Sequence, residues 1–175
     1  MKMRNKQNEL LIPLFILLFQ VFQTQAQSYG TALGVRLDGF GITLQQQVAS
    51  NSTVELIAQT AGFGKSDVQF SALFEQHKSL ITRGLNFYLG GGLYKLWYDK
   101  DKIENAGKTN PYGISPIMGL ELNLGKLLLS GDVKPNLKLG GDGKGLEWHT
   151  GISIRYELHG RYFKEEKWKF WKKKK

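Results

Sequence analysis

The residues best suited to chemistry are charged side chains that stand at alternate positions within otherwise apolar segments. They are Arg36, Glu55, Glu75, Glu121, Asp132, Lys134, Arg155 and Glu157. Opposite charges that share a narrow enclosed space pair with one another and fill it. Packed carboxylates also favour the binding of a proton or a cation, because each disfavours ionisation of its neighbour. The pattern predicts a polar network that plugs an interior, with proton or cation binding by the glutamates as the alternative.

Catalytic groups are less evident in the sequence. His149 and Ser153 fall on one face of an extended segment, but four residues of strand separate them by roughly 13 Å, which is beyond hydrogen-bond reach. Glu75 and His77 are close enough to interact, yet no serine is placed beside them as a nucleophile. We therefore predict no catalytic residues.

Metal and cofactor sites also lack a convincing pattern. Asp99, Asp101 and Glu104 suggest calcium, but their spacing differs from that of an EF-hand loop and lysines lie between them. The glycines at 90–92 open no helix, so they form no phosphate loop and should instead relieve crowding or permit curvature in a strand. The chain has no cysteine, which excludes a disulfide framework. We expect no metal and no cofactor.

Strands with a period of two must position these side chains. In the segment 148–158, WHTGISIRYEL, one set of alternate residues is mostly apolar or aromatic and the other is small or polar. The same alternation runs through eight segments: 29–38, 42–49, 53–60, 68–77, 84–95, 113–124, 126–134 and 148–158. Ile57 interrupts the alternation of its segment. An even number of strands can close with both ends on one side, leaving no edge strand. The fold class predicted is all-β, an eight-stranded antiparallel up-and-down transmembrane β-barrel.

The N-terminus has the three parts of a secretory signal. A basic region precedes the apolar run from Leu10 to Phe22, and Thr24 and Ala26 supply small residues for cleavage. This run is shorter than the ~20 residues of a spanning helix, so a cleaved signal peptide is favoured over an uncleaved anchor. The predicted domains are a signal peptide at 1–26, a barrel at 27–160 and a basic aromatic tail at 161–175.

The positive charge is concentrated in that tail. Residues 161–175 contain Arg161 and seven lysines against two glutamates, so the tail carries +6 of the +7 that remains after signal removal. The nearly neutral body gives no support for nucleic-acid binding. Trp168, Phe170 and Trp171 alternate with lysines, a pattern typical of a membrane interface. We expect a membrane-interface tail, with a solvated tail as the alternative.

The sequence resembles the small eight-stranded outer-membrane β-barrel proteins, the OmpA/OmpX-like class, and most of all their uncharacterised "outer membrane β-barrel domain" members in Gram-negative bacteria. The resemblance covers roughly residues 27–160 and rests on the signal ending at Ala26, GTALGVRLDGFGITL, LNFYLGGGLY, GLELNL, and DVKP leading to GISIRY. It implies an outer-membrane location, but the class shares no common activity. A structural or surface-interaction role is the expectation. The alternatives are a lipid-A-modifying hydrolase or acyltransferase, or a soluble periplasmic barrel that binds an apolar ligand.

The resemblance also assigns a role to the last predicted strand. His149, Gly151, Ile154 and Tyr156 match the signal that the barrel-insertion machinery reads in such proteins. The partners implied are outer-membrane lipid, that machinery, and an unknown extracellular partner bound through the loops 97–112 and 135–146. The chain is expected to be a monomer.

Overall fold

The computed structural model describes residues 29–64, 66–80, 84–141 and 145–160. The strands are β1 (Tyr29–Arg36), β2 (Gly41–Ala49), β3 (Ser52–Thr60), β4 (Val68–Ser79), β5 (Leu85–Trp97), β6 (Tyr112–Leu124), β7 (Leu127–Gly140) and β8 (Gly145–Gly160), and the helix is α2 (Lys100–Ala106). The predicted signal peptide and the basic aromatic tail lie outside the described residues. No helix among the described residues is long and apolar enough to cross a membrane.

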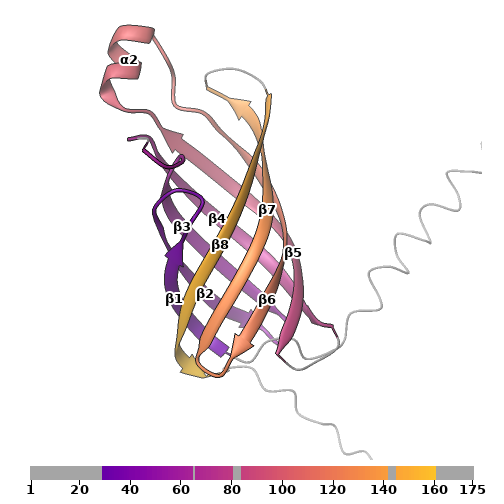
Figure 1. Ribbon diagram of the computed structural model, residues 1–175. Coiled ribbons are helices and arrows are strands. Elements are labelled where there is room, and N and C mark those ends of the chain that lie inside the picture. Colours follow the sequence, from indigo (N-terminus) through magenta and orange to yellow (C-terminus); the bar gives the residue numbers. More distant parts are fainter. Residues whose placement is uncertain (1–28, 65, 81–83, 142–144, 161–175) are drawn as a thin grey trace, which may run out of the picture.

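The strands form one closed barrel in sequence order (Figure 1). Each strand pairs antiparallel with the next, and β8 returns to pair with β1, where Val35 lies opposite Ile154. Because β1 and β8 pair, none of the eight strands keeps a free edge. The predicted eight-stranded antiparallel up-and-down barrel is confirmed.

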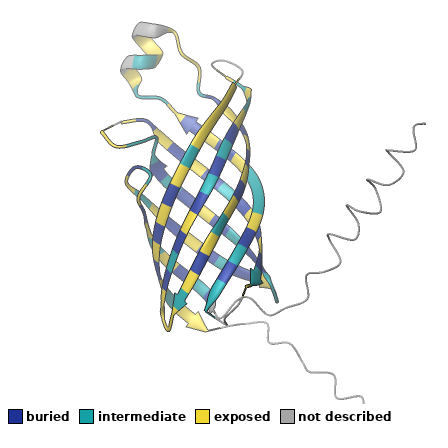
Figure 2. Ribbon diagram, turned by 45° about the vertical axis from the view of Figure 1, so that its right-hand side comes forward, coloured by how far each residue is buried: buried dark blue, intermediate teal, exposed yellow. Residues whose placement is uncertain are grey.

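Side chains alternate across the barrel wall along most of each strand, as Figure 2 shows in the bands of buried and exposed residues. In β8, Ile152 and Tyr156 are exposed on the outside, whereas Ser153 and Arg155 are buried on the inside. The alternation explains Ile57, which points into the interior with the polar side chains of β3 and packs with Leu73, Tyr88 and Ile117. The apparent break in the pattern of β3 is therefore an apolar residue on the inner face.

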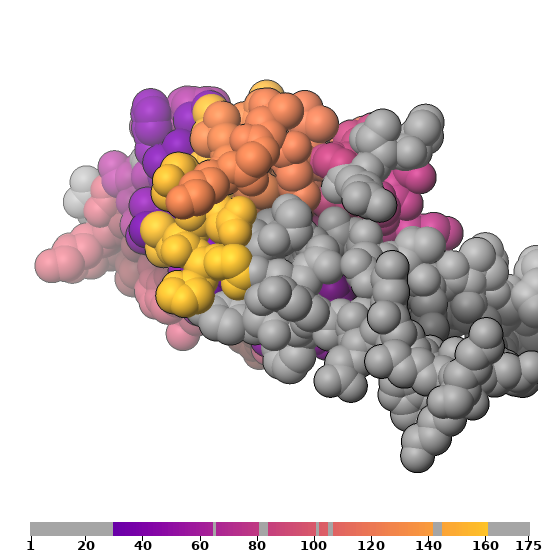
Figure 3. Space-filling view, turned by 90° about the horizontal axis from the view of Figure 1, so that it is seen from below, coloured from indigo at the N-terminus to yellow at the C-terminus, as the bar shows by residue number. Residues whose placement is uncertain are grey.

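The two ends of the barrel differ in their connections. The start of β1 and the end of β8 lie at one end, the termini end, together with the β2–β3, β4–β5 and β6–β7 connections (Figure 1). Figure 3 views the termini end, where the β6–β7 hairpin lies beside the last residues of β8. The opposite end, the loop end, has the β5–β6 connection with α2. At the loop end β7 and β8 rise higher than β1 and β2 (Figure 1).

The prediction of a long loop over 135–146 was wrong. β7 continues to Gly140 and β8 begins at Gly145, so most of this stretch is paired strand. Pro135 suggested a strand end because it cannot donate a ladder hydrogen bond. In the structure Pro135 and Pro116 both fall between the paired positions Ile114–Leu137 and Met118–Val133, and the register is the same on either side. The two prolines interrupt the ladder locally without ending either strand.

The other predicted loop, 97–112, is confirmed to within one residue at each end and is partly helical. Trp97 ends β5 and Tyr112 begins β6, and between them α2 spans Lys100–Ala106. Asp99 caps the helix by accepting a hydrogen bond from the backbone N–H of Lys100 at 2.6 Å, and Gly107 ends it in a left-handed conformation. The loop is therefore a folded element rather than an extended polar connection.

The glycines in β5 allow neighbouring strands to approach closely. A Cβ built on Gly90 would overlap the carbonyl oxygen of Phe74, and one on Gly92 would overlap that of Ala72. The prediction that the glycines at 90–92 relieve crowding is confirmed for Gly90 and Gly92, whereas a Cβ on Gly91 would make only ordinary contacts at 3.6 Å.

Candidate functional site: the polar interior of the barrel

The interior of the barrel is polar and its outer surface is apolar. Among the described residues, 22 polar or charged side chains are buried against 8 hydrophobic ones, while 32 large hydrophobic side chains are exposed. A soluble protein places its residues in the opposite way. Seven of the eight predicted interior residues, Glu157 excepted, are at most 6 % exposed.

The first group of interior charges is centred on Arg36, at the end of β1. Its Nη1 and Nη2 donate to the two carboxylate oxygens of Asp132 at 2.8 and 2.6 Å. Its Nε lies 3.3 Å from the carboxylate of Asp38, and Tyr88 donates its hydroxyl to Asp132 at 3.0 Å. The paired, planar geometry of a guanidinium and a carboxylate makes this the most directional contact in the interior.

Gly151 provides the space that Arg36 occupies. A Cβ built on Gly151 would overlap the Arg36 guanidinium. The glycine of the predicted insertion signal therefore has a packing role in the folded barrel as well.

The second group is centred on Arg155 of β8. Its Nη2 donates to Glu55, its Nη1 donates to Ser130 at 2.8 Å, and its Nε donates to Thr43 at 3.3 Å. Thr43 in turn donates to the same carboxylate of Glu55. The guanidinium thus links β2, β3, β7 and β8 across the barrel.

A third group joins β4 to β5 and β6 around His77. Its two ring nitrogens lie 3.5 Å from Glu75 and 3.9 Å from Glu121, and its ring stacks on Tyr88 with centroids 5.3 Å apart. Gln45 donates to Glu75 at 2.7 Å. Among the described residues no cluster of three or more His, Cys, Asp or Glu side chains is arranged to hold a metal ion.

The remaining predicted interior residues differ in position. Lys134 is fully buried and its Nζ lies 3.5 Å from Ser71 Oγ, while the neighbouring Asn136 donates to Gln69 at 3.1 Å. Glu157 is only half-buried near the end of β8, where its backbone N–H donates to the carbonyl of Lys126 at 2.8 Å. It therefore lies at the margin of the interior, whereas the other seven lie within it.

Several contributors to the interior were not singled out from the sequence. They are Thr43, Gln45, Thr53, Tyr88 and Ser130 among the polar partners, and Leu73 and Ile117 among the apolar ones. Strand parity was the signal that could have found them, because each lies an even number of residues from another buried polar residue of its own strand.

The residues of the predicted insertion signal lie on both faces of β8. Gly151 and the half-buried His149 point inward, and Ile154 and Tyr156 are exposed on the outside. His149 and Ser153 lie four residues apart on the inner face, and Ser153 Oγ accepts a hydrogen bond from Arg36 at 3.3 Å. The hydroxyl is therefore engaged in the interior network.

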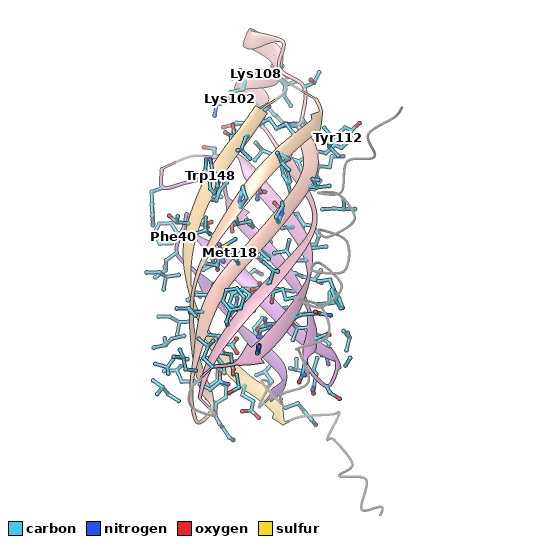
Figure 4. The ribbon with its side chains drawn as sticks, turned by 90° about the vertical axis from the view of Figure 1, so that its right-hand side faces the viewer. Phe40, Lys102, Lys108, Tyr112, Met118 and Trp148 are labelled. Carbon is cyan, nitrogen blue, oxygen red and sulfur yellow. The ribbon has the colours of Figure 1, made fainter. Side chains whose placement is uncertain are left out.

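Aromatic side chains mark the loop end of the outer surface. Trp97 and Tyr112 end the outward-facing rows of β5 and β6 and are 41 % and 54 % exposed, and Trp148, 68 % exposed, is the next-to-last outward residue of β8, before Leu146. We call these three residues the aromatic girdle. In Figure 4, Tyr112 and Trp148 lie above Met118, and Lys102 and Lys108 lie above them in turn. The girdle thus separates an apolar band from a charged loop.

The charged loop is held in place by its own contacts. Lys102 forms an ion pair with Asp67 at 2.7 Å, which ties α2 to the β3–β4 connection. The ammonium groups of Lys102 and Lys108 lie 6.0 and 5.3 Å from the ring centroid of Tyr98. These contacts give the β5–β6 connection a defined shape above the barrel.

Together these features define a closed β-barrel with an apolar outer wall and an interior filled by paired polar side chains. The same fold occurs in the N-terminal β-barrel domain of Pseudomonas aeruginosa OprF, with a TM-score of 0.52 and 11 % sequence identity over 74 % of this chain and 98 % of that one. No family model and no curated protein matches the sequence.

Proposed function

We propose that this chain is an integral outer-membrane β-barrel protein of a Gram-negative bacterium, with a structural or surface-interaction role. The observation that carries the proposal is the inverted polarity of the wall. Outward-facing apolar side chains exposed to water would drive aggregation. In a bilayer the same side chains contact lipid acyl chains, which are as apolar as they are. A closed barrel also satisfies its backbone hydrogen bonds internally, as a spanning structure must.

The aromatic girdle supports this placement. Tryptophan and tyrosine concentrate where the hydrocarbon layer meets the headgroups. The apolar rows of β5 to β8 end at this girdle or beside it, and the charged α2 loop lies beyond it (Figure 4). With the start of β1 and the end of β8 on the periplasmic side, the α2 loop faces the outside.

The interior supports a plugged barrel rather than an open pore. Arg36 and Arg155 reach across the space inside and pair with carboxylates of other strands. An eight-stranded barrel is just wide enough for side chains to fill. Planar-bilayer recordings should therefore show no stable large conductance. A steady porin-sized open state would contradict the plug.

The outer surface available to a partner is the α2 loop, because the 135–146 hairpin is mostly paired strand. We also propose that the chain binds an extracellular partner, is recognised by the barrel-insertion machinery and is a monomer. Replacing 99–108 by a short glycine-serine linker should abolish binding to an extracellular partner. The same replacement should leave the barrel folded, because this segment is tied to the β3–β4 connection through Asp67, which pairs with Lys102 and accepts a hydrogen bond from the backbone N–H of Asp99.

The polar interior disfavours the soluble alternative, because a barrel that carries an apolar ligand needs an apolar lining. A fractionation experiment tests the proposal directly. The protein should appear in the outer-membrane fraction and should migrate differently on a gel before and after boiling, as folded barrels do. Recovery in the soluble periplasmic fraction would refute membrane insertion.

A further inference from the structure

The side of the barrel wall that is formed by β1, β2 and β3 carries an apolar groove on its outer surface. The groove is an open depression with a volume of about 520 Å³. Its apolar lining comes from the outward side chains Val35, Leu37, Phe40, Ile42, Ala58 and Val68. The lining residues Arg36 and Gln59 have their side chains buried on the other face of the wall, so no charged side chain enters the groove.

Short strands and two joined connections create the groove. β1, β2 and β3 have 8, 9 and 9 residues, against 13 to 16 for β5 to β8. At their loop end, Phe40 and Thr60 are joined by two hydrogen bonds of 2.9 and 3.0 Å, backbone to backbone and backbone to hydroxyl. These bonds hold Phe40 edge-to-face against Phe63, with ring centroids 5.5 Å apart. The rim is therefore built before any ligand arrives.

The height of the groove indicates what covers it. In Figure 4, Phe40 lies well below Tyr112 and Trp148 of the aromatic girdle and close in height to Met118. The lining residue Val68 pairs with Trp97 of the girdle. If the girdle marks the membrane boundary, as the proposed function requires, the groove extends from that boundary into the hydrocarbon layer. The molecules present at that depth are lipid acyl chains.

We infer that this groove, which we call the β1–β3 groove, binds one acyl chain of an outer-leaflet membrane lipid. A chain that lies in this depression meets the side chains of its rim as well as those of its floor, so more carbon atoms come within van der Waals distance than on the convex wall. The bound chain is thereby held longer than the chains around the rest of the wall. This inference rests on the proposed membrane placement.

Photolabelling in vesicles tests the inference. The mature chain is reconstituted in phosphatidylcholine vesicles that contain a phospholipid with a diazirine in one acyl chain, and the labelled peptides are mapped after irradiation. Labelling of 35–42 and 58–68 should exceed that of 117–124 at least about threefold. The comparison segment contains Met118, which faces lipid at a similar height and is 53 % exposed.

Two alanine variants provide a matched pair. Ala58→Phe fills the β1–β3 groove and should lower its labelling to the level of the 117–124 segment. Ala72→Phe adds the same ring to the outer face of β4, outside the groove, and should leave the labelling unchanged. If Ala58→Phe fails to insert, the labelling ratio of the unchanged protein still decides the question.

The other outcomes are distinguishable. Uniform labelling around the wall of an inserted barrel would overturn the groove and leave the membrane placement intact. Labelling of 35–42 below that of 117–124, as a second copy of the chain covering the groove would give, would also overturn it. Absence of labelling on every strand would refute membrane insertion, and the groove inference would fall with it.

Discussion

Replacing Arg155 by methionine should strongly destabilise the barrel, because it leaves a buried carboxylate without its counter-charge. Arg155 is 1 % exposed and donates to Glu55, Thr43 and Ser130, and Glu55 is fully buried. In the variant the Glu55 carboxylate keeps the hydroxyl of Thr43 but loses the guanidinium.

The expected magnitude follows from the general behaviour of buried ion pairs. Removal of one partner typically costs about 3–5 kcal/mol, since the charge left behind is neither solvated nor paired. Total stabilities of proteins are roughly 5–15 kcal/mol, so the loss would be a large part of the whole. Replacing both partners should cost less, because a well-packed neutral pair is often no worse than the ions.

Urea unfolding in lipid vesicles measures this difference. The set comprises the unchanged protein, Arg155→Met, Glu55→Gln and the double variant, with Lys126→Met in the exposed β6–β7 turn as the control. The control should change stability by less than about 0.5 kcal/mol. The double variant should be more stable than Arg155→Met, with a coupling of roughly 0.5–3 kcal/mol. A loss below about 1 kcal/mol for Arg155→Met, or purely additive losses, would refute the pairing inferred for the interior.

Three further predictions concern packing, the outer wall and the tail. Gly151→Val should cost about 1–3 kcal/mol, because the new side chain overlaps a buried guanidinium, whereas Gly131→Ala, which meets nothing within 4 Å, should be tolerated; parallel urea titrations compare them. Ile152→Arg on the outer face should cost ~2–4 kcal/mol if the site is near the bilayer midplane, and equal stability in vesicles with the unchanged protein would contradict the assignment of the outer face. A synthetic peptide of residues 160–175 should bind anionic vesicles at low salt with a blue shift of tryptophan emission and be released at high salt, since the screening length falls from ~10 Å at 0.1 M to ~3 Å at 1 M. Absence of binding at low salt would indicate a solvated tail.

The number and direction of the strands could be predicted from the sequence because side-chain alternation is a local property. Any strand with one apolar face and one polar face repeats its pattern every two residues, and the pattern can be recognised within about 8 to 10 residues. For the same reason seven of the eight predicted charged residues lie within the interior. These local signals gave the wrong strand ends where the end of a strand depends on the neighbouring strands. Pro135 reads as a strand end in isolation, but it lies where the β6–β7 ladder is already interrupted beside Pro116.

Which polar side chains pair inside the barrel was decided by the tertiary structure alone. Arg36 and Asp132 are 96 residues apart and Arg155 and Glu55 are 100 apart, and nothing in either local segment indicates these pairs. Which inner residues meet depends on the register of all eight strand pairs and on the tilt that closes the ring, because each shift of register moves a side chain to another level. The sequence by itself determined which face of each strand is polar. Closure of the barrel determined which polar groups meet, and that the shorter β1, β2 and β3 leave a groove on one side of the wall.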